Sequence, residues 1–216
     1  MKATADTNMP KNFEFTEAEP RLYDWWEQNG WFKPEVASED AEPFVIGMPP
    51  PNVTGALHIG HALFTALEDL MIRYERMRGK AALWVPGTDH AGIATQLQVE
   101  KQLQEQGTSR QEVGYEEFLA RTWAWKEEKG GTIIKQLRRL GASCDWDRER
   151  FTLDDGLSEA VLQAFLTLWD QGLIYRGPRL VNWSPGLQTA VSDLEVETAD
   201  EEATLFFFNY PIEGGE

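Results

Sequence analysis

Short apolar runs alternate with amphipathic stretches in the first half of the chain. Residues 43–48 (PFVIGM) and 81–85 (AALWV) have the length and content of buried strands, and proline and glycine close both runs. Between them, residues 57–78 carry apolar side chains at helical spacing, and a further helix is predicted over residues 91–107. This order of strand, helix, strand and helix predicts an α/β fold with a Rossmann-like parallel sheet.

The same pattern divides the chain into three parts. Residues 1–42 are predicted to be an N-terminal extension whose short helix begins at Pro20, after a loose or extended start. Residues 43–180 hold the predicted parallel sheet with its helices, and residues 181–216 form a β-rich segment.

Further elements follow the predicted sheet. Helical patterns cover about residues 114–140 and 155–171. After these, the runs LVNW, DLEVE and EATLFFFNYPI favour strands because they are rich in β-branched and aromatic residues.

Charge and cysteine usage exclude several classes of protein. The net charge is −16, which repels a phosphate backbone and argues against a general nucleic-acid binder. The single cysteine, Cys144, excludes an internal disulfide and a four-cysteine zinc site. The first residues lack a signal-peptide pattern, and no apolar stretch approaches the roughly 20 residues that span a bilayer. We therefore expect a cytoplasmic protein without membrane contact.

The three histidines of the chain all lie at strand-to-helix junctions. His58 and His61 share a face at the start of a predicted helix, with Gly60 between them. Free N–H groups at a helix start suit a triphosphate, and two imidazoles there can donate hydrogen bonds to phosphoryl oxygens. For the HxxH spacing alone, two other interpretations stay open: histidines satisfied within a packed turn, and a metal-binding pair.

Asp89 is the second candidate for chemistry. It ends a Pro-Gly-Thr-Asp loop after the second predicted strand and precedes the predicted helix from Ala91. Its carboxylate could hold a substrate ammonium group, or it could cap that helix. The residues alone do not favour either role.

The longer sequence context carries a resemblance. Residues 49–61 (PPPNVTGALHIGH) resemble the HIGH signature of class I aminoacyl-tRNA synthetases, which follows the first strand of their nucleotide-binding sheet. Residues 84–96 (WVPGTDHAGIATQ) look like the valine-specific members, and residues 140–161 and 172–197 are also similar to them. The resemblance covers about residues 10–216.

The resemblance implies site residues. His58 and His61 would contact the ATP phosphates, and Gly60 would lie against the adenine. Two further residues, Asn52 and Thr54, would border the ATP, while the valine would lie against Pro50 and Asp89.

The resemblance also implies a reaction and partners. Valine would be activated with ATP and Mg²⁺ and then transferred to tRNA(Val), and an inserted β-rich domain would edit mischarged threonine. Residues 43–180 would be the first half of the catalytic domain, and residues 181–216 the beginning of the editing domain. Some relatives bind zinc through cysteines in the region that matches residues 182–187, which has none here, so we expect no zinc. The full-length protein is expected to be a monomer.

Two other classes of protein stay open at this point. One is a complete small nucleotidylyltransferase with the same histidine motif, and the other is a non-catalytic relative that binds ligands without turnover. The sequence contains no KMSKS-like loop, which is the second ATP-binding signature of the family. The chain is therefore expected to be an N-terminal fragment that does not charge tRNA by itself.

Overall fold

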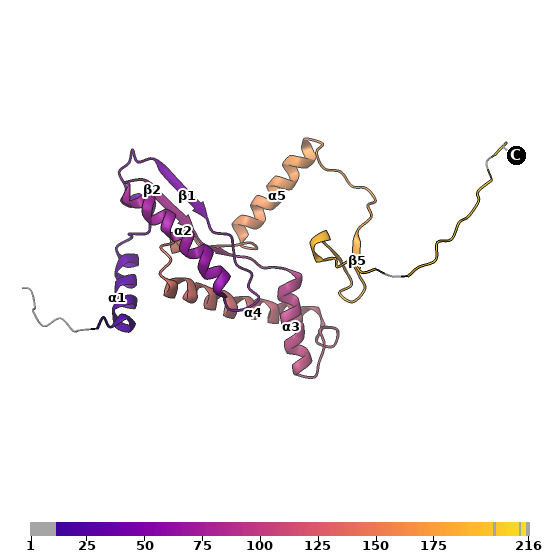
Figure 1. Cartoon of the computed structure of the whole chain (residues 1–216), viewed down its shortest axis with the longest axis horizontal. Helices are drawn as coiled ribbons and strands as arrows, with labels where there is room; N and C mark the ends of the chain where they lie inside the picture. The colour runs from indigo at the N-terminus through magenta and orange to yellow at the C-terminus, as the bar shows by residue number, and fades with distance from the viewer. Residues whose placement is uncertain (1–11, 201, 212, 215–216) are drawn as a thin grey trace, which may run out of the picture. The chain divides into compact units, whose positions relative to one another are not determined.

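The computed structural model describes residues 12–200, 202–211 and 213–214 (Figure 1). The chain forms two compact units, Met1–Phe165 and Leu166–Glu216. All residues proposed for the site belong to the first unit.

The first unit is built on a parallel strand–helix–strand motif. β1 (Pro43–Gly47) leads through a loop to α2 (Ile59–Met77), and β2 (Ala81–Val85) follows. β1 and β2 pair in parallel from Pro43 opposite Ala81 to Gly47 opposite Val85, and α2 packs against both strands (Figure 1). The predicted Rossmann-like motif is confirmed.

Residues 84–89, from the end of β2 onward, make backbone hydrogen bonds with two other segments of the chain. On one side Val53 N donates to Asp89 O at 3.0 Å, and on the other Asp145 N donates to Trp84 O at 3.0 Å. β3 (Gly87–Thr88) pairs in parallel with β4 (Arg150–Phe151). Gly87 permits this approach, because a Cβ there would lie 3.0 Å from the carbonyl oxygen of Arg150.

Two helices connect these strands. α3 (Ile93–Glu105) begins two residues later than predicted. α4 (Arg110–Leu140) begins earlier than predicted because Ser109 caps it, although Gly114 breaks the helical backbone with φ +80°. Gly141, at φ +90°, ends it in the left-handed region.

The prediction that the first helix begins at Pro20 is wrong. α1 (Phe15–Gln28) contains Pro20 as an interior residue, so residues 15–19 are helical rather than extended. Proline removes one backbone hydrogen bond, but the burial of Tyr23, which is 7% exposed, holds the helix against the core. The short turn η1 (Pro34–Val36) lies between α1 and β1, and residues 1–11 lie outside the described part of the chain.

A buried segment after α4 joins three elements of the first unit. Residues 142–146 are at most 9% exposed, and the turn η2 (Trp146–Arg148) begins at their end. Tyr23 of α1 donates its hydroxyl proton to Ala142 O at 2.6 Å and accepts a hydrogen bond from Trp146 Nε1 at 2.7 Å. Burial raises the pKa of the Cys144 thiol far above its usual range, so this cysteine stays protonated.

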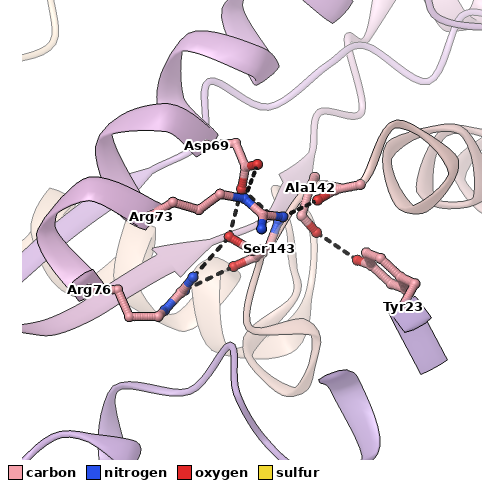
Figure 2. A network of polar contacts seen from close by, with 7 residues as sticks. Tyr23, Asp69, Arg73, Arg76, Ala142 and Ser143 are labelled. Carbon is pink, nitrogen blue, oxygen red and sulfur yellow. Dashed lines mark hydrogen bonds and ion pairs between the residues drawn. The ribbon is translucent and has the colours of Figure 1, made fainter. Parts of the chain in front are cut away.

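Polar side chains of α2 hold the same segment from the other side, as Figure 2 shows. Asp69 Oδ1 accepts hydrogen bonds from the backbone N (2.9 Å) and the hydroxyl (2.6 Å) of Ser143. Arg73 binds the other oxygen of Asp69 at 2.6 Å and donates to Gly141 O at 2.8 Å. The buried face of α2 is therefore partly polar.

The apolar stripe of α2 is less buried than its spacing suggests. Leu63, Leu67, Leu70 and Tyr74 are each more than half exposed in the described structure, whereas Ile72 is fully buried. The spacing correctly predicted a helix, but the face turned to the sheet is the one that carries Ile72 and Asp69.

In the second part of the chain, two strand predictions are wrong. α5 (Asp155–Asp170) matches its prediction, and β5 (Asn182–Ser184) forms an antiparallel pair with β6 (Thr189–Val191), which was not predicted. The run DLEVE instead contains the turn η3 (Asp193–Glu195), because Ser192 caps it and donates its backbone N–H to the Glu195 carboxylate at 2.8 Å. Residues 202–211 form no strand, since no described segment pairs with them, and residue 212 lies outside the described part of the chain.

We predict that Tyr23→Phe lowers the free energy of unfolding by about 2 kcal/mol. The change leaves a buried carbonyl and a buried indole N–H without their partner, and each such loss costs about 1–3 kcal/mol. Urea unfolding measures the effect. Tyr115→Phe is the control because Tyr115 is 74% exposed, and equal stability of the two variants would contradict the prediction.

Candidate active site

The loop between β1 and α2 surrounds a hollow of about 380 Å³. Five of the residues predicted from the sequence line it: Pro50, Asn52, Thr54, His58 and His61. The remaining lining residues are mostly apolar: Pro49, Pro51, Gly55, Ala56, Leu57 and Phe64. The loop thus gathers these predicted residues around one open volume.

His58 caps α2 with its own side chain. Its Nδ1 accepts a hydrogen bond from the backbone N of Gly60 at 3.1 Å, so the ring satisfies one of the free N–H groups of the helix start. A Cβ on Gly60 would lie 2.9 Å from the His58 ring, which explains why glycine occupies this position. In this structure the His58 ring lies over Gly60, where the sequence interpretation expected an adenine.

His61 completes a reciprocal cap. Its Nδ1 accepts a hydrogen bond from the backbone N of His58 at 3.2 Å, and the two ring centres are 4.0 Å apart. Partial burial and the neighbouring His58 charge lower the pKa of His61, which favours its neutral form.

The two caps together determine where each ring carries its proton. Because Nδ1 of both His58 and His61 accepts a backbone hydrogen bond, each neutral ring has its proton on Nε2. Two N–H donors are thereby available next to the start of α2. Such donors suit an anionic ligand such as a phosphate.

Two residues of α4 anchor the loop, and neither was predicted from the sequence. Trp125 Nε1 donates to Val53 O at 2.8 Å, and Gln136 Oε1 accepts from Leu57 N at 2.8 Å. Neither residue belongs to a motif, and their positions on a long helix give no sign that they meet a loop 70 or more residues earlier. The contact depends on tertiary packing.

Asp89 lies beside this loop through backbone pairing. Asn52 and Asp89 form a parallel bridge, in which Asp89 N donates to Pro51 O at 2.9 Å. The ends of the two strand segments therefore bring Asn52 and Asp89 together, as expected for a parallel sheet.

The helix-capping alternative for Asp89 does not hold. α3 begins at Ile93, and its cap residue is Gly92, which makes no side-chain cap. Asp89 Oδ1 instead accepts hydrogen bonds from Ala91 N at 3.1 Å and from the Thr152 hydroxyl at 3.1 Å. Its carboxylate is about one-third exposed, so it stays accessible to a ligand.

The described residues contain neither a metal cluster nor a membrane span. No three His, Cys, Asp or Glu side chains gather within residues 12–200, 202–211 and 213–214 in a way that could hold a metal ion. Over the same ranges, every helix is too short or too polar to cross a bilayer.

Comparison with known proteins identifies the family. A family model described as tRNA synthetases class I (I, L, M and V) matches residues 21–207. The chain is 59% identical over 204 residues to the valine–tRNA ligase, chloroplastic/mitochondrial 2, of Arabidopsis thaliana. This alignment covers 94% of this chain and 21% of that protein. It is 58% identical over 208 residues to a valine–tRNA ligase of Caulobacter vibrioides, covering 96% and 23%. The chain thus spans about a fifth of the length of these curated relatives.

A solved structure has the same fold. It is the ternary complex of an Agrobacterium radiobacter LeuRS with tRNA and LeuAMS, which matches 83% of this chain and 21% of that chain with a TM-score of 0.68 at 21% identity. The parallel sheet, the histidine loop at the start of α2 and the family match agree: the chain belongs to the class I tRNA synthetases.

Proposed function

We propose that the complete protein is a valine–tRNA ligase, of which this chain supplies the first part of the ATP and amino-acid site. The observation that carries the proposal is the identity of 53–59% over nearly the whole chain with proteins of that name. The geometry supports it, because the loop with His58 and His61 and the loop with Asp89 are joined at the Asn52–Asp89 bridge.

The reaction has two steps. A carboxylate oxygen of valine attacks the α-phosphorus of ATP, the bond from that phosphorus to the bridging oxygen breaks, and pyrophosphate leaves. A ribose hydroxyl of the 3′-terminal adenosine of tRNA(Val) then attacks the valyl carbonyl carbon, the bond from that carbon to the phosphate oxygen breaks, and AMP leaves. No protein nucleophile is required, so the protein acts by alignment and by stabilising charge on the phosphoryl group.

His58 and His61 act on the ATP phosphates in this proposal. Their Nε2 protons can be donated to phosphoryl oxygens while Nδ1 of each ring keeps its backbone contact. Asn52 and Thr54 border the ATP in the same hollow. Gly60 lies against the adenine only if the His58 ring moves away when ATP binds, since the ring now covers it.

Asp89 binds the ammonium group of valine, and Pro50 borders the same substrate. The Asp89 carboxylate is accessible, and two hydrogen bonds already fix one of its oxygens. A fixed carboxylate binds an ammonium group at a lower entropic cost than a mobile one.

The remaining parts of the proposal come from the sequence. An apolar pocket rejects threonine only about a hundredfold against the isosteric valine, as is known for valine–tRNA ligases in general. We therefore propose that residues 181–216 begin an editing domain. In this proposal Mg²⁺ enters with ATP, and no zinc is bound. The complete protein is a monomer in the cytoplasm, without membrane contact.

Exchange of pyrophosphate into ATP tests the proposal. The complete protein should catalyse exchange that depends on valine. Exchange that depends on a substrate other than an amino acid would favour a small nucleotidylyltransferase, and ligand binding without exchange would favour a non-catalytic relative.

We predict that His58→Ala or His61→Ala in the complete protein slows valine-dependent exchange about a hundredfold. Each change removes a donor whose hydrogen bond strengthens as charge builds on the phosphates, which is worth about 3 kcal/mol. The dissociation constant for valine should change little, and calorimetry measures it. A near-normal exchange rate in either variant would refute the role given to that histidine.

We predict that Asp89→Asn weakens valine binding about tenfold or more and leaves ATP binding unchanged. Asparagine keeps an oxygen for Ala91 N and Thr152, but it lacks the charge that a bound ammonium group needs. The Michaelis constants for valine and ATP in the exchange assay separate the two effects. An unchanged valine constant would show that Asp89 only shapes the loop.

A further inference from the structure

Thr152 lies at the centre of a polar cluster and was not among the site residues predicted from the sequence, although it belongs to the family-like stretch 140–161. Its hydroxyl oxygen is 3.1 Å from Asp89 Oδ1, 2.5 Å from His90 Nδ1 and 2.9 Å from the backbone N of His90. Asp89 and His90 are neighbours in the loop after β3, whereas Thr152 comes from the end of β4, more than 60 residues later. The cluster therefore forms only in the folded chain.

The protons in this cluster can be assigned. The contact between the two oxygens needs the hydroxyl proton, because an ionised carboxylate has none to donate. Because the Thr152 hydroxyl proton is donated to Asp89, it is not available to His90. Nδ1 of His90 must therefore be the donor in its contact with the Thr152 hydroxyl oxygen. With the backbone N of His90 as a second donor, the hydroxyl makes one donated and two accepted hydrogen bonds, which satisfies it completely.

These contacts occupy one carboxylate oxygen of Asp89 and leave the other for a ligand. Oδ1 accepts from Thr152 and from Ala91 N, while Oδ2 makes no hydrogen bond among the described residues. Backbone pairing holds Thr152 itself, since its N donates to Thr88 O at 3.2 Å. Thr152, which directly follows β4, therefore holds Oδ1 of the Asp89 carboxylate.

We propose that Thr152 is a positioning residue that fixes Asp89 so that Oδ2 faces the ammonium group of the amino-acid substrate. The inference rests on the proposed function, in which Asp89 binds that group. Thr152 acts through Asp89 and does not touch the substrate. By the same contacts it places a proton on Nδ1 of the His90 ring.

The test uses Thr152→Val in the complete protein, because valine has nearly the shape of threonine but lacks the hydroxyl. The Michaelis constant for valine in pyrophosphate exchange should rise about tenfold, equivalent to one hydrogen bond to a charged group. The constant for ATP and the thermal midpoint should stay close to those of the unsubstituted protein. Thr152→Ser, which restores the hydroxyl, should recover most of the affinity for valine.

A control and a double variant distinguish positioning from a general structural role. Thr122→Val removes a hydroxyl that donates to Phe118 O within α4, far in sequence from Asp89, and it should not alter the valine constant. In an Asp89→Asn background, Thr152→Val should add little, because both changes act on one interaction. A normal valine constant in Thr152→Val, or a full additional loss in the double variant, would overturn the inference.

Failure of the proposed function has a different signature. If Asp89→Asn weakens valine and Thr152→Val does not, the function stands and only the inference fails. If the unsubstituted protein shows no valine-dependent exchange, the proposed function fails and the inference falls with it.

Discussion

The backbone hydrogen bonds on both sides of residues 84–89 are the constraint on which the rest of the structure depends. One side of this segment pairs with the chain that leaves β1, and the other with the chain that leads through β4. Parallel strands end at the same edge of a sheet, so three loops from distant parts of the sequence meet there. Asn52, Asp89 and Thr152 come together for this reason, and no side-chain attraction is needed to explain it.

The same pairing buries backbone groups inside the first unit, and side chains of two helices supply their hydrogen bonds. Residues 142–146 are buried before they reach β4, so their backbone groups need partners other than water. Asp69 of α2 and Tyr23 of α1 supply hydrogen bonds to Ser143 and Ala142. The helix that carries the two histidines at its start is thereby tied, through Asp69, to the segment that leads to β4 and Thr152.

The sequence predicted what depends on local pattern and missed what depends on tertiary packing. Periodicity and the proline and glycine stops predicted β1, β2 and α2, and the residues that line the hollow came from one contiguous motif. Local pattern gave the wrong helix start where a distant contact decides the structure. α1 continues through Pro20 because Tyr23 packs in the core. Local pattern failed again for DLEVE, where Ser192 stabilised a turn. Trp125, Gln136 and Thr152 have no local signature, because each acts on a loop far away in sequence.

A crystal structure of the complete protein with a non-hydrolysable valyl-adenylate analogue tests the central claim, that the loops after β1 and β2 form one site for ATP and amino acid. The account predicts phosphoryl oxygens within hydrogen-bond distance of Nε2 of His58 or His61. It also predicts the ammonium group on Asp89 Oδ2, with Thr152 still bound to Oδ1. An analogue bound with its ammonium group away from Asp89, or its phosphoryl group away from both histidines, would contradict it.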